Sequence, residues 1–214
     1  MKHKAAEIIR EYGPFSGIDD VAGVSFDRNH VWFASGDRLN ALDPESGEIT
    51  ASIDTTADAG TAFDGQHLFQ LAGAQINKVD PKTGEVLATI PAPGGTGHSG
   101  LAWAEGFLWI GQHRDRRIHQ VDPDTGKIHR TIESDRFVTG VTWVDGELWH
   151  GTWQDGESDI RRIDATSGEV LEHLQMPSGS GVSGLESDGG GRFFCGTGSA
   201  GKVLVVRRPR SDLE

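Results

Sequence analysis

The stretch Val121-Asp122-Pro123-Asp124-Thr125-Gly126 occurs four times in this chain in nearly the same form. The aspartates of the four copies, Asp43, Asp80, Asp122 and Asp164, are separated by 37, 42 and 42 residues, and a period of about 40 residues is typical of repeat architectures. An apolar residue precedes each copy and an alternating apolar segment follows it, which predicts a tight turn between two β-strands. Strand, turn and strand at this period predict the blades of a β-propeller.

A second pattern precedes each Asp-Pro turn: a short apolar strand, a turn, and another apolar strand. Its clearest copies are Leu101-Ala-Trp103 with Leu108-Trp-Ile110, and Val141-Thr-Trp143 with Leu148-Trp-His150. Weaker copies begin at Val24, Ala62 and Gly184. The sequence therefore predicts five blades, at roughly residues 16–54, 55–93, 94–134, 135–177 and 178–210.

The fifth copy lacks an outer strand, because the chain ends soon after Lys202-Val-Leu-Val-Val206. Residues 6–12, Ala-Glu-Ile-Ile-Arg-Glu-Tyr, have the alternation of an outer strand and precede the first blade. Pairing of this N-terminal strand with the last blade would close the ring and leave no exposed sheet edge. We therefore expect one all-β domain over residues 1–214, a five-bladed β-propeller closed by its N-terminal strand.

Composition excludes several classes of partner. The formal net charge is -12, with 20 Lys and Arg against 32 Asp and Glu, which argues against a nucleic-acid partner. No apolar run approaches the length of about 20 residues that a membrane span needs. The N-terminal residues do not resemble a secretory signal, and the single Cys195 is consistent with a reducing compartment. We expect a cytoplasmic protein.

Several conspicuous residues are predicted to be structural. The four turn aspartates have the position of side chains that accept hydrogen bonds from backbone N–H groups. Trp32, Trp109 and Trp149 occupy the same place in three copies, which indicates a core between blades. Cys195 lies in a Phe-Phe-Cys-Gly strand and is expected to be a small buried residue.

The candidate site lies on the face opposite the Asp-Pro turns, here called the upper face. Two loops of each blade open there, and loops held by a rigid scaffold commonly carry function. These loops contain side chains that can bind or ionise: Asp19, Asp20, Asp37, Arg38, Asp58, His98, Gln112, His113, Arg114, Arg136, Phe137, Trp153, Gln154, Asp155 and Glu157.

Three histidines are candidates for chemistry near neutral pH. His98 and His113 lie on the two upper loops of one blade, and His150 is expected to end a strand of the next. One of them is a candidate general base, and together they are a candidate set of ligands for a divalent metal. The chain has no metal motif of fixed spacing such as His-Glu-x-x-His, which favours hydrogen-bonded or exposed histidines and no cofactor.

The order of segments resembles the glutaminyl-peptide cyclotransferases of the five-bladed propeller type found in bacteria and plants. Ile9-Arg-Glu-Tyr12 with Gly23-Val-Ser-Phe26 resembles the beginning of that family, and Leu68-Phe-Gln-Leu71 resembles its Leu-Tyr-Gln-Leu-Thr-Trp. In the fourth blade, Trp153-Gln154 matches the end of its Gly-x-x-Trp-Ala-Asn-Val-Trp-Gln. The resemblance spans nearly the whole chain. It implies the propeller fold and an activity that closes an N-terminal glutamine onto its own amine and releases ammonia.

The chain departs from that family where the chemistry would be. Phe33 stands in place of the family's acid, Gly73 in place of a tryptophan, and Gly97-His98-Ser99 in place of Glu-Gly-Trp. Only Trp153 and Gln154 match among the pocket residues. A phenyl ring cannot transfer a proton, a step worth typically 10²- to 10⁴-fold in rate, so glutamine cyclisation is not expected.

The leading hypothesis is that a small polar molecule or a peptide N-terminus binds on the upper face and is transformed there by different chemistry. Trp153 would stack on the ligand, and Gln154, Gln112, Arg114 and Arg136 would contact it, with His98, His113 or His150 as base. One alternative is a propeller that binds a ligand or a protein without catalysis. Another is a metal-dependent lyase similar to the streptogramin lyases, in whose Trp-Phe-Thr-Glu motif the acid is replaced here by Gln112.

Overall fold

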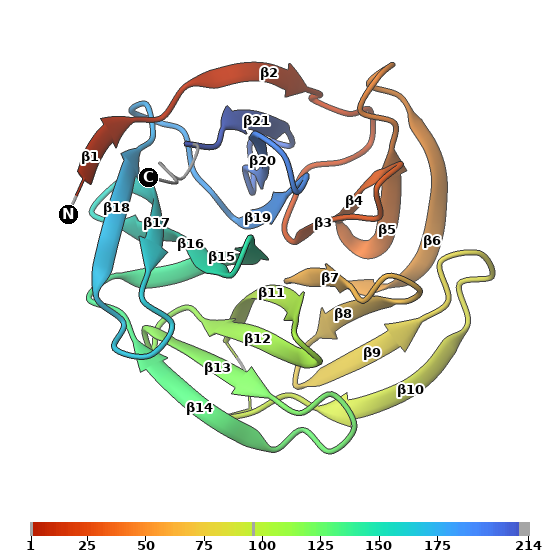
Figure 1. Cartoon of the computed structure of the whole chain (residues 1–214). Helices are drawn as coiled ribbons and strands as arrows, with labels where there is room; N and C mark the ends of the chain where they lie inside the picture. The colour runs from red at the N-terminus through yellow and green to blue at the C-terminus, as the bar shows by residue number, and fades with distance from the viewer. Residues whose placement is uncertain (1, 96, 210–214) are drawn as a thin grey trace.

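The computed structural model describes residues 2–95 and 97–209, which form β-strands and no helix. Five sheets surround a central axis like the blades of a propeller, each with its first strand innermost (Figure 1). The predicted all-β, five-bladed propeller is confirmed. Since the described residues include no helix, none is present there that could cross a membrane.

Consecutive strands of each blade pair antiparallel, from the axis outward. Blade 1 contains β3 (Val24–Phe26), β4 (Val31–Ala34), β5 (Gly36–Leu42) and β6 (Ile49–Ala57). Blade 2 contains β7 (Thr61–Phe63), β8 (Leu68–Ala72), β9 (Gln75–Val79) and β10 (Val86–Pro91). Blade 3 contains β11 (His98–Ala104), β12 (Phe107–Gln112), β13 (Arg117–Val121) and β14 (Ile128–Glu133). Blade 4 contains β15 (Phe137–Val144), β16 (Glu147–Gln154), β17 (Glu157–Ile163) and β18 (Val170–Gln175). Blade 5 contains β19 (Gly184–Ser187), β20 (Arg192–Gly196) and β21 (Val203–Arg207).

The N-terminal segment closes the ring. Strand β2 (Ile8–Tyr12) pairs antiparallel with β21 and is the outer strand of blade 5, as the sequence predicts. A further strand, β1 (Lys2–Ala5), pairs parallel with β18 and adds a fifth strand to blade 4, which was not predicted. The N-terminal segment thus joins two neighbouring blades at their outer edges (Figure 1).

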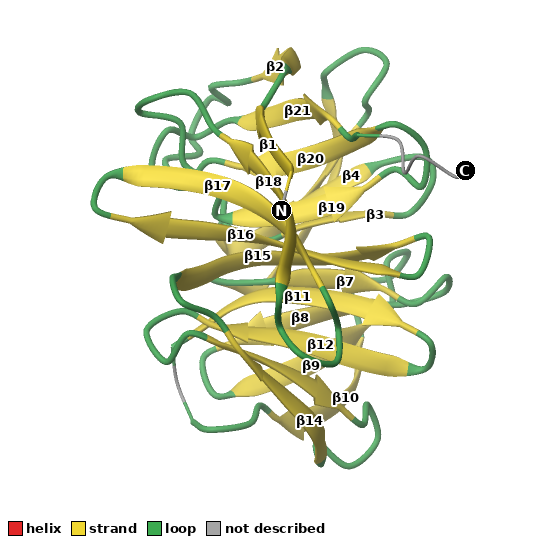
Figure 2. Cartoon of the chain, turned by 60° about the vertical axis from the view of Figure 1, so that its left-hand side comes forward, coloured by secondary structure: helices red, strands yellow, loops and turns green. Residues whose placement is uncertain are grey.

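The Asp-Pro turns have the predicted structural role. In each turn, an aspartate oxygen accepts hydrogen bonds from the backbone N–H groups that follow, as from Glu45 to Asp43 at 2.8 Å and from Thr125 to Asp122 at 2.8 Å. Asp80 and Asp164 accept the same bonds. These hydrogen bonds hold the pKa of all four carboxyl groups below the ordinary aspartate value. The strands run between this lower face and the loops of the upper face (Figure 2).

Five glycines form a ring around the central axis. Each inner strand has, in its first four residues or directly before it, a glycine whose missing Cβ would lie closer than 3.0 Å to the backbone of the next blade. The five are Gly23, Gly60, Gly100, Gly140 and Gly184. Only glycine permits such an approach of one backbone to another. The ring brings the inner strands together and makes the residue before each glycine part of a common floor on the upper face.

Aromatic pairs join neighbouring blades. Trp109 of blade 3 stacks on Trp143 of blade 4, with ring centroids 5.3 Å apart, and Phe69 of blade 2 stacks on Trp103 of blade 3 in the same way. Trp32, Trp109 and Trp149 are at most 4% exposed, so their predicted place in the core is confirmed. Cys195 is also buried, and burial raises the pKa of its thiol far above the ordinary value.

Candidate functional site

The centre of the upper face is hollowed into a funnel with a floor of small residues. The floor consists of the residues that precede the five glycines: Ala22, Ala59, Ser99, Thr139 and Ser183. Two adjoining hollows of about 400 Å³ and 310 Å³ lie above it and share His113, Thr139 and Ser183. Volumes of this size are typical of sites for small molecules.

Thr139 is the floor residue whose hydroxyl group lacks a partner. Its side chain is 7% exposed, and no residue in the described part of the chain hydrogen-bonds to Oγ1. The other two floor hydroxyls are engaged: Ser99 donates to Val138 O at 2.8 Å, and Ser183 donates to Val21 O. A buried hydroxyl without a partner is costly. Oγ1 faces Gly151, where an added Cβ would lie 2.5 Å from it, so rotation of the Thr139 side chain is needed to bring the hydroxyl to a ligand in the funnel.

His113 stands beside Thr139 on the wall shared by the two hollows. Its Nδ1 lies 3.0 Å from Val138 O, and because a carbonyl only accepts hydrogen bonds, Nδ1 must carry the hydrogen. The ring packs against Phe137, with centroids 5.0 Å apart. Nε2 is the nitrogen left free of Val138 O, and in the neutral tautomer that this bond selects, its lone pair can accept a hydrogen bond or a proton from a ligand.

His98 lines the first hollow and also braces its loop. It donates from Nε2 to Pro93 O at 2.7 Å, and its Nδ1 lies 3.3 Å from Gly73 O. The rim beside it carries one charge of each sign, Asp58 and Arg114. Both are exposed, and no ion pair is formed by Arg114 within residues 2–95 and 97–209.

Trp153 forms the wall of the second hollow. It is 37% exposed, and it faces Gly181, whose missing Cβ would lie 3.8 Å from the indole ring. The loop around Gly198 completes this wall. His113 and Trp153 occupy equivalent places in blades 3 and 4, five residues after Leu108 and Leu148. A large flat surface is therefore open to a ligand beside the polar floor.

Three residues that the sequence predicts as ligand contacts, Gln112, Arg136 and Gln154, do not line either hollow. Gln112 is 3% exposed, donates to Pro93 O at 3.0 Å and accepts from His119 at 2.8 Å. Arg136 donates to Asp159 at 2.6 Å and to the main-chain oxygen of Gln154. The side-chain oxygen of Gln154 is itself buried without a hydrogen bond among the described residues.

The expected place of His150 is wrong. Strand β16 continues to Gln154, so His150 lies in its middle, 1% exposed and between blades 3 and 4. Burial lowers the pKa of its imidazole to about 4. The structure therefore brings together His98 and His113 but not His150. The described residues contain no group of three or more His, Cys, Asp or Glu side chains placed to hold a metal ion.

The hydroxyl-bearing floor was not predicted. The signal lies in the repeat itself, since Ser99, Thr139 and Ser183 each precede an equivalent glycine that begins the inner-strand pattern. Aligning the copies on the glycine, and not on the Asp-Pro turn, identifies these positions as neighbours around the axis.

Comparisons with known proteins define the fold. No family model and no curated protein matches the chain. Among solved structures, it is similar to glutaminyl cyclase of Myxococcus xanthus, with a TM-score of 0.79 and 19% identity over 96% of this chain and 97% of that one. It is less similar to the WD40 β-propeller domain of Doa1, with a TM-score of 0.56 and 16% identity over 87% of this chain and 63% of that one. The predicted similarity in fold to the cyclotransferase propellers is confirmed, and this chain is a five-bladed β-propeller with the overall fold of the Myxococcus glutaminyl cyclase.

Proposed function

We propose that the upper-face funnel binds a small polar molecule or a peptide N-terminus, of the class of amino acids, amines and amides. The observation that carries this function is the buried, unpartnered hydroxyl of Thr139 at the junction of the two hollows. Ligand pockets typically combine an apolar wall with a few fixed polar groups, and here these are Trp153, Thr139 and Nε2 of His113.

The groups of the funnel indicate which parts of a ligand they would contact. Nε2 of His113 accepts from an N–H or ammonium group, whereas the hydroxyl of Thr139 donates to or accepts from an amide. A planar amide or carboxyl group fits against the indole of Trp153. Arg114 and Asp58 at the rim offer one charge to each end of a zwitterion.

The chemistry of the funnel supports binding better than glutamine cyclisation. Phe33, in the place of the related enzymes' acid, is fully buried and stacks on Phe15 with centroids 5.0 Å apart. The five floor residues include no carboxylic acid that could protonate the amide nitrogen that leaves as ammonia. If the ligand is transformed, His113 is the general base that the geometry favours, because its second nitrogen is held by Val138 O.

The metal-dependent lyase has less support. Gln112, the residue in the place of that family's acid, is engaged by Pro93 and His119 inside blade 3. A ligand role would require both hydrogen bonds to break.

Thr139→Val tests the proposal. The substitution preserves shape and removes the hydroxyl, so we expect a compound found in a thermal-shift screen of amino acids, amines and amides to bind about three- to tenfold more weakly. The free energy of unfolding should stay the same or rise by about 1 kcal/mol, because the lost hydroxyl has no partner. Isothermal titration and urea unfolding measure the two effects.

Thr139→Ser is the matched control, since it retains the hydroxyl and should retain affinity. Equal affinity of the valine and serine variants for every hit would contradict the proposal. An assay for ammonia release from N-terminal glutaminyl peptides separates binding from cyclisation, and we expect no turnover; robust turnover would restore the cyclase activity that Phe33 argues against.

A further inference from the structure

The outer strands of the blades share a position that faces the Asp-Pro turn of the next blade. In every blade this position comes directly after a shift in the pairing register between the outer strand and the strand beside it. The residues at the position are Arg10, Ala51, Ala88, Arg130 and Glu172. Where the residue is arginine, its guanidinium group enters the crevice between blades. Arg130 donates to Ala165 O at 2.8 Å, and Arg10 donates to Pro44 O at 2.8 Å.

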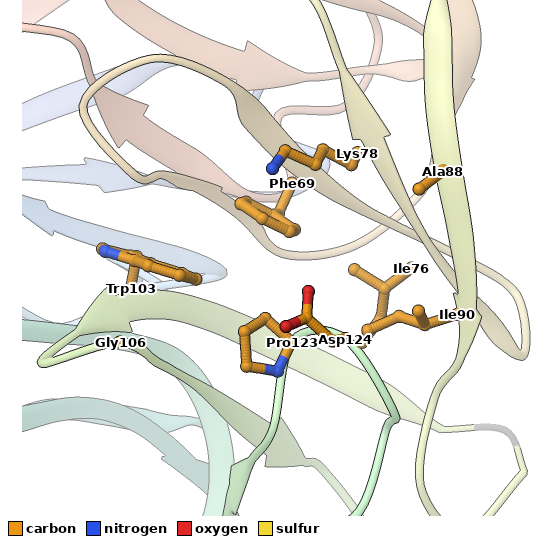
Figure 3. A pocket seen from close by; sticks show the side chains of 9 residues that line it. All are labelled: Phe69, Ile76, Lys78, Ala88, Ile90, Trp103, Gly106, Pro123 and Asp124. Atoms are coloured by element: carbon orange, nitrogen blue, oxygen red, sulfur yellow. The ribbon is translucent and has the colours of Figure 1, made fainter.

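Between blades 2 and 3 the arginine is replaced by Ala88, and a cavity of about 390 Å³ remains (Figure 3). Pro123 follows the turn aspartate there, as Pro44 and Ala165 do in their blades. Its carbonyl oxygen accepts no hydrogen bond within the described ranges. This crevice therefore has the carbonyl oxygen that accepts from a guanidinium group in the crevices of Arg130 and Arg10, but it has alanine in place of the arginine.

The other walls of this crevice suit a flat cation. Phe69 and Trp103 stack at one end, with ring planes 13° apart, and Ile76 and Ile90 form an apolar side (Figure 3). The carboxylate of Asp124 points into the cavity and forms no ion pair within the described part of the chain (Figure 3). An aromatic surface, a carboxylate and a carbonyl are the groups that a guanidinium contacts through stacking and paired hydrogen bonds.

Two lysines affect the charge of this crevice and of the crevice between blades 1 and 2. Lys78 lines the cavity with its ammonium group 5.5 Å from the centroid of the Phe69 ring, so Trp103 is the aromatic surface left for an incoming cation. The Lys78 ammonium also lies 3.8 Å from Asp64, which offsets its charge. The crevice between blades 1 and 2 also has alanine, Ala51, at the arginine position, and its cavity is about 700 Å³. It carries Lys82 where the other has Asp124, so at the equivalent position of the turn it presents a cation and not a carboxylate.

We propose that the crevice between blades 2 and 3 binds the guanidinium group of an arginine side chain presented by another polypeptide. The incoming side chain takes the place that Arg130 and Arg10 fill from within the chain, donating to Pro123 O and to Asp124 while its plane lies near Trp103. The formal net charge of -12 favours the approach of a cationic partner. This site is separate from the upper-face funnel, so either proposal can fail alone.

Binding is measured by NMR on the indole N–H signal of Trp103, assigned with Trp103→Phe. The probes are N-acetyl-arginine methylamide and the capped tripeptide Gly-Arg-Gly, each compared with its citrulline counterpart, which has the same shape without the charge. We expect both arginine probes to shift the signal and the citrulline probes to bind about tenfold more weakly. Equal binding of arginine and citrulline would overturn the site. Binding of the single residue but not of the tripeptide would overturn a polypeptide as its source.

Ala88→Arg supplies the missing side chain from within and gives a second test. We expect it to abolish the response to both arginine probes and to raise the melting temperature by about 2 to 4 °C, as one added hydrogen bond would. The matched control is Ala51→Arg, which fills the neighbouring crevice and should leave the Trp103 response unchanged. Undiminished binding to the Ala88→Arg variant would contradict the proposal even if its stability rises.

Discussion

Asp159→Asn should cost about 3 to 5 kcal/mol of unfolding free energy, because it leaves two arginines in blade 4 without their buried counter-charge. Asp159 is fully buried, and it accepts from Arg136 Nη1 at 2.6 Å, from Arg161 Nε at 3.0 Å and from the hydroxyl of Thr152. Burial alone would raise the pKa of Asp159, but the Thr152 hydrogen bond and the two guanidinium groups outweigh it and hold the pKa below the ordinary value. Asparagine keeps the shape and loses the charge.

Urea unfolding at pH 7 measures this cost, and Asp135→Asn is the control. Asp135 also binds Arg161, but its side chain is 72% exposed, so its loss should cost less than about 1 kcal/mol. Similar losses for the two variants would show that burial of the Asp159 cluster does not decide its contribution.

Glu186→Gln should stabilise the protein at alkaline pH by about 3 kcal/mol. Glu186 belongs to the inner strand of blade 5 and contacts both flanking blades, accepting from Thr142 of blade 4 and from Ser25 of blade 1. Part of its surface remains accessible near the axis, but burial of the rest raises the pKa of Glu186 from 4.5 to about 7. Above that pH the folded chain holds a poorly solvated charge, and each unit of pKa shift corresponds to about 1.4 kcal/mol.

The sign of the pH dependence follows from the raised pKa. The folded chain binds this proton more tightly than the unfolded chain, so the contribution of Glu186 is fully present below about pH 4.5 and is lost as the pH rises through about 7. Unfolding of both proteins in urea from pH 4.5 to pH 8.5 measures it. We expect the two stabilities to converge at acid pH, to separate as the pH rises from about 4.5 to about 7, and to keep a constant difference at higher pH. A difference that stays constant over the whole range would contradict the raised pKa.

The fold was predictable because its signal is repeated. Four Asp-Pro turns at a nearly constant spacing, with alternating strands around them, define the blades, and the missing fifth outer strand points to residues 6–12. Strand β1 was not predictable in this way. Its pairing with β18 is a single parallel contact between distant segments, and no second copy of it exists in the sequence to reveal a pattern.

The site was predictable only in part because the direction of a side chain depends on register. His113 and Trp153 lie on the funnel wall because each stands five residues after the equivalent leucine of its blade, Leu108 or Leu148. His150 is equivalent to the buried Ile110 and stands three residues before the wall position. The strand predicted from the sequence ends a few residues too early, and this error placed His150 on the upper face instead of inside the sheet. Thr139 was not predicted as a site residue, because a single threonine in a sequence does not show that its hydroxyl group will be buried without a hydrogen-bond partner.

A crystal structure with the compound that gives the largest thermal shift tests the funnel most directly. The account predicts that the compound lies between Thr139 and Trp153, with a polar atom within hydrogen-bonding distance of Thr139 Oγ1 and another facing Nε2 of His113. A compound bound elsewhere, with the funnel unchanged, would contradict it.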